Sequence, residues 1–284
     1  VNLSLLNTDW YADQMKRAAY NSPPVPFSIP EYQYRQGTRD VVLLNPPANR
    51  ENPFMNLDEA MKVATDDNQR RDFGDGKSYA YLPSSALRIP VDSAAVVNAG
   101  VVAPEDADKI VDAIEWTITD GSDRPKSYLL KNHFLVLDLL NNNDWSRPIY
   151  FAVTTGPDSY IGLNQYFRLE GLAYRFVPIE YPENRNPNVL GGFASDLMYE
   201  KIMNDFQWGG MDDVSGNGVY MDENNRRMSD NLRLQFSNLA EQLIEESKNK
   251  KALNVLDKVV EITPEKNLPY DRIMLPITID FLIA

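Results

Sequence analysis

The feature that most restricts the fold is an alternation between two apolar patterns along residues 1–187. Short runs rich in apolar residues predict buried strands at 1–6, 41–44, 79–82, 87–91, 115–118, 149–153 and 172–177. Helical spacing of apolar residues predicts helices at 9–18, 56–65 and 131–140. Because helices that alternate with buried strands are typical of covered sheets, we predict an α/β domain, a sheet flanked by helices, over residues 1–187.

The pattern changes after Pro187. Ser195 is placed to cap a helix, and a glycine-rich stretch at 209–218 marks a loop. We therefore expect residues 188–228 to form a connector with one helix and a glycine-rich loop.

Residues 229–284 carry the clearest periodic signal. Ala240, Ala252 and Pro264 are equally spaced, as small, small and proline residues are in a tetratricopeptide repeat. The spacing predicts a tetratricopeptide-like helical tail, with the first helix of a second repeat from Tyr270. An ordinary helical hairpin is the alternative.

Charge and composition exclude several function classes. The 284 residues carry a formal net charge of -13, which repels phosphate backbones and anionic headgroups, so we expect no nucleic-acid partner. The chain has no cysteine and one histidine, His133. Thiolate chemistry and multi-histidine metal sites are therefore excluded, and we expect no metal and no cofactor.

The apolar runs are too short to span a bilayer, which needs about 20 consecutive apolar residues. The sequence begins and stops inside apolar runs, at Val1 and at 281–284, whereas natural ends are commonly polar. We expect this chain to be a fragment of a longer protein.

Three sequence features could indicate metal binding, catalysis or ligand binding, and each also has a simpler structural interpretation. Residues 213–218 resemble the first half of a calcium loop, but Asn224 stands where the bidentate glutamate belongs, so a surface turn is favoured. His133 has no nucleophilic serine motif beside it, so a structural role is favoured. Glu170 lies at a turn before a strand, where α/β sheets bind ligands, although a solvated carboxylate beside Arg168 is the simpler reading. We predict no catalytic residues.

If a small-molecule site exists, two groups of residues are placed to build it. Asp9 and Trp10 follow the first expected strand, and Thr154, Thr155 and Asp158 follow the strand at 149–153. The carboxyl ends of parallel neighbouring strands open on one edge, where ligand crevices form. An indole among carboxylates and hydroxyls suits a neutral sugar better than a phosphate. Alternatively, Asp9 only caps its helix and Trp10 only packs.

Arg147 precedes the strand at 149–153 and would lie at its opposite end. We expect it to be structural, in an ion pair with Asp138 or Asp144.

Several long strings carry a family resemblance, among them VNLSLLNTDWY at 1–11, YRQGTRD at 34–40, NNNDWSRPIYFAVTTGPD at 141–158 and LNQYFRLEGLAYRFVP at 163–178. They resemble the C-terminal soluble region of a family of large bacterial inner-membrane proteins. That family is similar to multi-span glycosyltransferases that use lipid-linked sugars, including protein O-mannosyltransferase relatives. The resemblance implies that the catalytic acidic residues lie in the membrane half, outside this chain.

The expected function is a non-catalytic extracytoplasmic domain of a membrane glycosyltransferase-like protein, on the periplasmic side of the bacterial inner membrane. The expected partners are the membrane domain of the same polypeptide and a protein or glycan acceptor. Two other readings stay open: an independent periplasmic enzyme that acts on glycans, and a protein-interaction module of the cell envelope.

Overall fold

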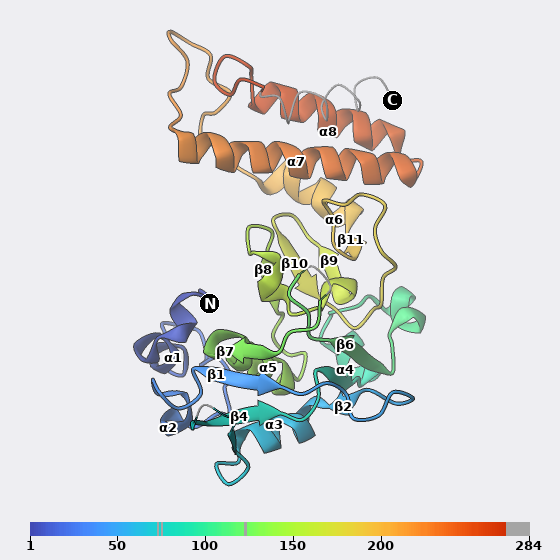
Figure 1. The fold of residues 1–284 in the computed structure, drawn as a ribbon. Coiled ribbons are helices and arrows are strands. Elements are labelled where there is room, and N and C mark those ends of the chain that lie inside the picture. The colour runs from blue at the N-terminus through green and yellow to red at the C-terminus, as the bar shows by residue number, and fades with distance from the viewer. Residues whose placement is uncertain (73, 75, 122–123, 271–284) are drawn as a thin grey trace. The chain divides into compact units, whose positions relative to one another are not determined.

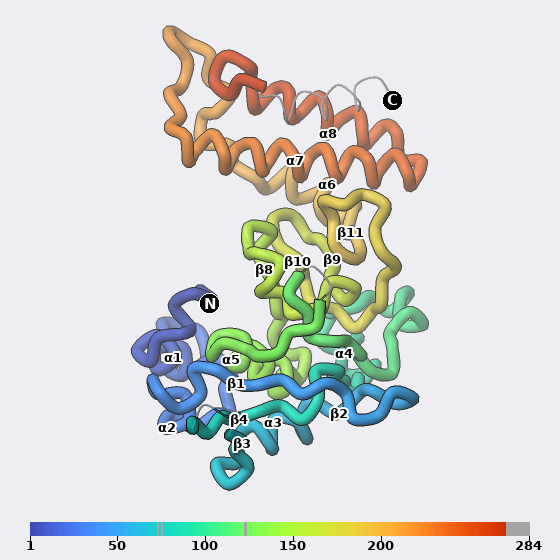
Figure 2. Tube along the Cα trace, in the orientation of Figure 1, coloured from blue at the N-terminus to red at the C-terminus, as the bar shows by residue number. Residues whose placement is uncertain are grey.

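A computed structural model describes residues 1–72, 74, 76–121 and 124–270. The chain divides into two compact units that interleave in sequence. The first unit comprises residues 1–149, 154–166 and 176–180, and the second comprises residues 150–153, 167–175 and 181–284. Figure 1 shows the elements of both units, and Figure 2 traces the chain through them.

The first unit contains a four-stranded sheet with the order β3-β4-β1-β7. Its strands are β3 (Arg71–Asp72), β4 (Ser78–Leu82), β1 (Val41–Leu44) and β7 (Tyr128–Leu130). β1 runs parallel to β4 and antiparallel to β7, with Val42 opposite both Ala80 and Leu129. All three of these residues are buried, so the middle of the sheet belongs to the core.

A three-stranded sheet completes the extended structure of this unit, in the order β2-β5-β6. Its strands are β2 (Met55–Asn56), β5 (Ala86–Pro90) and β6 (Ala113–Thr117). The apolar residues Leu87, Ile114 and Trp116 of this sheet are buried.

Short helices connect and cover the strands of the first unit. They are α1 (Asp9–Met15), α2 (Glu31–Tyr34), α3 (Leu57–Thr65), α4 (Ser93–Asn98) and α5 (Lys131–Asn141), with 3-10 turns at Leu5–Asn7, Pro104–Lys109, Pro157–Tyr160 and Asn164–Tyr166. α5 is nearly enclosed, because it packs against β1, β7 and α3. Its first residue, Lys131, follows β7 directly.

The second unit joins a small sheet to helices. Its sheet has the order β11-β9-β10-β8, with β8 (Tyr150–Ala152), β9 (Phe167–Leu169), β10 (Ala173–Phe176) and β11 (Gly192–Phe193). Its helices are α6 (Ser195–Glu200), a π-helical turn (Lys201–Asp205), α7 (Glu223–Glu245) and α8 (Asn249–Ile262). Figure 1 shows α7 and α8 side by side.

The predicted α/β class with a helical C-terminal segment is confirmed. Within the described residues, however, the strands belong to three small sheets rather than to one. No helix of the described residues is both long enough and apolar enough to cross a membrane.

The prediction of a strand at 1–6 is wrong, because this segment forms a 3-10 turn at Leu5–Asn7 before α1. The side-chain Oδ1 of Asn2 accepts a hydrogen bond from the backbone N–H of Leu5 at 3.0 Å. Such local bonds offer the backbone an alternative to a sheet ladder. Val1 and Leu5 are also exposed, so their side chains form no buried strand face.

The helical tail contains the expected pair of helices. Ala240 and Ala252 are both buried, which allows α7 and α8 to approach closely, and Pro264 follows the end of α8. The tetratricopeptide-like character itself stays a prediction. The second repeat predicted from Tyr270 lies almost wholly outside the described residues.

Candidate ligand pocket and the other polar clusters

An open pocket of about 740 Å³ lies in the first unit, between α1, the turn after α2 and the junction of β7 with α5. We call it the Trp10 pocket. Within the described residues, its charged lining consists of three carboxylates and two cations, Asp9, Asp13, Asp40, Arg35 and Lys131. The pocket therefore contains two of the predicted site residues, Asp9 and Trp10.

Lys131 is the structural centre of this pocket. Its side chain is 3% exposed, and its Nζ lies 2.9 Å from Asp9 Oδ1 and 3.3 Å from Asp40 Oδ1. The ammonium also donates to the backbone carbonyl of Tyr34 at 2.9 Å. A buried ammonium requires such compensation, so Lys131 fixes the two carboxylates and the segment after α2 in one arrangement.

The carboxylate of Asp9 is held in its ionised form. Partial burial raises its pKa, but the backbone N–H of Gln36, the ammonium of Lys131 and the nearby Arg35 together hold the pKa below its ordinary value. The N–H of Gln36 donates to Asp9 Oδ2 at 3.0 Å. Since the Asp9 side chain is 29% exposed, part of this anion still faces solvent.

Asp40 shapes the neighbouring turn. Its Oδ2 accepts a hydrogen bond from the N–H of Gly37 at 2.7 Å. Gly37 has a φ of 85°, a conformation that glycine adopts without steric cost. This turn places Gln36 and Asp40 at the pocket, and the Asp40 side chain remains 47% exposed.

Asp13 and Arg35 form a further ion pair in the pocket, at 2.9 Å between Asp13 Oδ2 and Arg35 Nη1. The phenol of the buried Tyr34 donates to Asp13 Oδ1 at 2.7 Å and, with Arg35, lowers the pKa of Asp13. Burial and the bond to Asp13 raise the pKa of Tyr34. Arg35 also pairs with Glu31 one helical turn earlier.

Trp10 supplies the apolar surface of the pocket. Its side chain is 57% exposed, which is unusual for the largest apolar residue type. The ring meets Tyr11 edge to face at a centroid distance of 5.5 Å, and the Tyr11 hydroxyl accepts the backbone N–H of Asn2 at 2.7 Å. The indole of Trp10 is thus held on one side by Tyr11 and remains more than half exposed in a pocket that Leu130 also lines.

Thr154, Thr155 and Asp158 do not line the Trp10 pocket. Thr154 is exposed and Thr155 half-buried in the turns after β8. Asp158 pairs with Lys126 at 2.5 Å, and its Oδ2 lies 3.6 Å from His133 Nε2. Their predicted meeting with Asp9 and Trp10 assumed a parallel strand at 1–6, which is not present.

His133 lies on α5 with its side chain 4% exposed. Burial, and then the positive charge of Lys126, lower the pKa of His133 to about 4, while Asp158 opposes this shift. The imidazole is therefore neutral near pH 7.

Glu170 is enclosed in the second unit. Its side chain is 5% exposed. Its Oε1 accepts from Arg168 Nε at 2.9 Å and lies 3.8 Å from Arg175 Nη1, while its Oε2 accepts from the Tyr150 hydroxyl at 2.8 Å. Burial and the bond to Glu170 raise the pKa of Tyr150. This carboxylate stabilises the turn between β9 and β10. The sequence-based alternative of a solvated carboxylate beside Arg168 is therefore wrong, because the Glu170 side chain is buried.

The glycine-rich loop at 213–218 binds a lysine of its own chain. Lys266 Nζ donates to the carbonyls of Val214 at 2.7 Å and Gly216 at 2.9 Å. Lys266 therefore holds this loop against the segment that follows α8. Within the described residues there is also no group of three acidic, histidine or cysteine side chains that would hold a metal.

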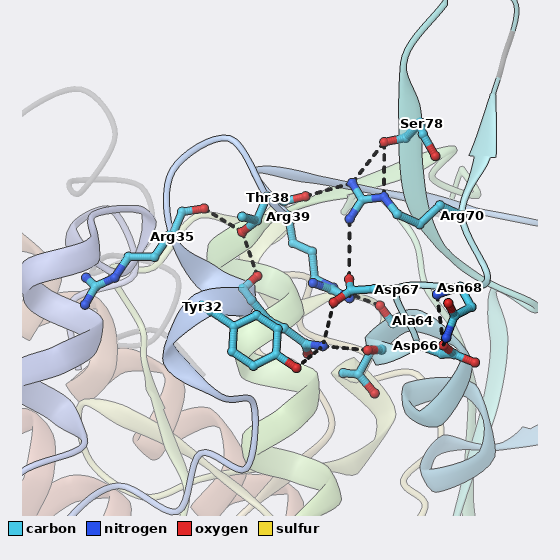
Figure 3. Close-up of polar contacts among 12 residues, drawn as sticks. Tyr32, Arg35, Thr38, Arg39, Ala64, Asp66, Asp67, Asn68, Arg70 and Ser78 are labelled. Atoms are coloured by element: carbon cyan, nitrogen blue, oxygen red, sulfur yellow. Dashed lines mark hydrogen bonds and ion pairs between the residues drawn. The ribbon is translucent and has the colours of Figure 1, made fainter.

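Two arginines outside the pocket have structural partners. Arg147 donates to the carbonyl of Pro24 at 2.7 Å, whereas Asp138 accepts from Ser28 and Ile29. Asp144 accepts from Ser146, so the expected ion pair of Arg147 with Asp138 or Asp144 is wrong. Arg39, which is buried, donates to the Ala64 carbonyl at 2.9 Å and pairs with Asp67 at 2.7 Å (Figure 3). Arg39 therefore ties the segment after α2 to the end of α3.

Sequence reasoning missed the residues that neutralise and shape the Trp10 pocket, which are Asp13, Arg35, Asp40 and Lys131. A signal for two of them was present, because the string YRQGTRD at 34–40 contains both Arg35 and Asp40 around a glycine turn. Lys131 gave no local signal, since its contact with Asp9 joins residues 122 positions apart.

Comparison with known proteins identifies the family of this chain. No curated protein and no solved structure shows significant similarity to this chain. The family model described as TMEM260-associated domain 2 matches residues 1–197, which include the whole of the Trp10 pocket. Since this match spans more than half of the sequence, the chain belongs to the TMEM260-associated domain 2 family.

Proposed function

We propose that this chain is a non-catalytic extracytoplasmic domain of a membrane glycosyltransferase-like protein, and that it holds a glycan or a glycan-bearing acceptor in the Trp10 pocket. The observation that carries the proposal is the pocket itself, in which an exposed indole stands beside ionised carboxylates. Binding sites for small molecules are concavities that combine aromatic surface with a few fixed polar groups. The C–H face of a sugar ring packs on an indole, while its hydroxyls donate to carboxylates.

The charge state of the pocket favours binding over chemistry. A general acid at neutral pH needs a carboxyl whose pKa is raised toward 7. The pKa values of Asp9 and Asp13 are instead lowered by their hydrogen bonds and cationic neighbours. These groups accept hydrogen bonds well but have no proton to give at neutral pH.

The membrane setting of the proposal comes from the resemblance of the long strings at 1–11, 34–40 and 141–178 to the soluble region of bacterial inner-membrane proteins. In that setting the catalytic carboxylates belong to the membrane domain of the same polypeptide, on the periplasmic side. This domain would then present an acceptor to them. The family match over residues 1–197 is compatible with this setting.

A glycan array tests the binding half of the proposal. We expect the wild-type chain to bind a subset of neutral glycans and Trp10→Ala to lose that binding. Tyr20→Ala is the matched control, because Tyr20 is a fully exposed aromatic residue that does not line the pocket. Equal binding by wild type and Trp10→Ala would show that the pocket is not the glycan site.

A transfer assay tests the other half. We expect no turnover when the chain is incubated with lipid-linked sugars and acceptor peptides. Turnover that disappears in Glu170→Gln would instead support the independent-enzyme reading. Absence of glycan binding together with capture of a defined envelope protein through α7 and α8 would support the interaction-module reading.

A further inference from the structure

We propose that the Trp10 pocket selects an uncharged saccharide ring and rejects phosphate-bearing saccharides, so that it holds the acceptor glycan and not a phosphate-linked sugar donor. This inference rests on the proposed function, in which the pocket binds a glycan. It adds the chemical class of the ligand and the step of the transfer at which the domain acts.

The first argument concerns the backbone amides at the start of α5, the nearest natural site for an anion. The N–H of Lys131 donates to the Asp40 carbonyl at 3.1 Å, and the N–H of Asn132 donates to Asn7 Oδ1 at 3.0 Å. The N–H of His133 donates to the side chain of Asn132 at 2.9 Å. These three amides already have partners within the protein, so a phosphate would have to displace them.

The second argument concerns the cations of the pocket. Lys131 is buried and shared between Asp9, Asp40 and the Tyr34 carbonyl, and Arg35 is paired with Asp13 and Glu31. A phosphate binds through arginine or lysine groups that are available to it. Here Lys131 and Arg35 are already paired with carboxylates of the protein. Within the described lining, carboxylates also outnumber these two cations.

The third argument concerns what the pocket offers instead. Asp9 and Asp40 keep solvent-exposed carboxylate surface, and a carboxylate oxygen accepts more than one hydrogen bond. Hydroxyl groups of a neutral sugar are donors for these oxygens, and the exposed indole of Trp10 takes the apolar side of the sugar ring. A phosphate has only acceptor oxygens at neutral pH and would face like charge.

Calorimetric titration with matched ligand pairs tests the inference. The probes are methyl glycosides of glucose, galactose, mannose and N-acetylglucosamine, each compared with its 6-phosphate at one fixed salt concentration. We expect at least one neutral glycoside to bind and its 6-phosphate to bind about tenfold more weakly, because a like charge a few ångströms away opposes it. Trp10→Ala should weaken the neutral ligand by about tenfold, and Tyr20→Ala should not.

Asp40→Asn is the variant that isolates the charge effect. Asp40 is half-exposed, and asparagine keeps an oxygen for the Gly37 N–H. We expect this variant to bind the neutral glycoside more weakly, because a neutral amide replaces one of the acceptor carboxylates, while the ratio of neutral-glycoside affinity to 6-phosphate affinity shrinks by about threefold or more. An unchanged ratio would contradict the charge argument.

The outcomes separate the two proposals. Equal or tighter binding of the 6-phosphate, still dependent on Trp10, overturns this inference and leaves the glycan-binding function in place. If Trp10→Ala leaves the affinity for every glycoside unchanged, the proposed function is overturned as well. If none of the four neutral glycosides binds, the inference is wrong, and the glycan array alone then decides the proposed function.

Discussion

The Trp10 pocket can be compared with a second group of residues, Glu170, Arg168, Arg175 and Tyr150, which we call the Glu170 cluster. Both combine carboxylate, cation and aromatic side chains. In the pocket the side chains of Asp9 and Asp40 are 29% and 47% exposed, and they lie beside about 740 Å³ of open space. In the cluster the Glu170 side chain is 5% exposed and bound by its own arginine and tyrosine neighbours. The difference teaches that a carboxylate can bind a ligand only where its side chain is accessible to solvent. The type of residue alone does not distinguish a binding site from a buried structural cluster.

Removal of the Glu170 carboxylate should give the largest effect. Glu170→Ala leaves Arg168 and Arg175 without their shared anion, so we expect a loss of about 3 kcal/mol in unfolding free energy. Urea denaturation followed by circular dichroism measures this loss. Glu170→Gln retains an acceptor for Tyr150 and should lose less, and neither variant should alter glycan binding.

Acidification should give the next largest effect, through His133. Its pKa is about 4 in the folded protein and about 6.5 in an unfolded chain, so the folded state binds fewer protons between these values. Stability from this residue is fully present above pH 6.5 and is lost as the pH falls toward 4, by about 3 kcal/mol in total. Denaturation curves at pH 7 and pH 4.5 measure it. His133→Gln should show a smaller difference between the two curves, and an unchanged difference would place the titration elsewhere.

Trp10→Ala should lower glycan affinity without lowering the stability of the fold. We expect glycan affinity to fall by about tenfold, and the unfolding free energy to change by less than about 0.5 kcal/mol because the ring is more than half exposed. Calorimetry and urea denaturation give the two values. A large loss of stability would mean that the indole is a packing residue, which is the plainer sequence reading.

Salt should give the smallest effect. If the ligand is neutral, raising NaCl from about 50 to 500 mM should change glycan affinity by less than about twofold, since screening acts on pairs of charges. A steep decline of affinity with salt would indicate an ionic ligand and would contradict the proposal that the pocket binds a neutral saccharide.

Local sequence patterns predicted much of the fold, because β1, α3, β4, β5, β6 and α5 depend on apolar periodicity within short segments. They failed at 1–6, where the side chain of Asn2 accepts from the backbone N–H of Leu5 and the segment forms a 3-10 turn instead of a strand. They also could not show that the strands divide among several small sheets, because strand pairing is decided by tertiary contacts.

The candidate site was predictable only in part, for a similar reason. The prediction of Asp9 and Trp10 rested on an expected strand at 1–6, whereas the structure has a 3-10 turn before α1. Lys131 is the residue that makes this pair a pocket, and its ion pair with Asp9 spans 122 positions. Glu170 stood out equally well in the sequence, and only its burial distinguishes it from Asp9.

The most direct test of the central claim is a ¹H–¹⁵N NMR titration of the chain with a neutral glycan that binds on the array. The account predicts that the shifts concentrate at the Trp10 indole N–H and at the amides of Gln36, Leu130 and Lys131, which line one pocket. It also predicts that these shifts disappear in Trp10→Ala and persist in Glu170→Gln. Shifts that concentrate instead around Tyr150, Glu170 and Arg175 would contradict it.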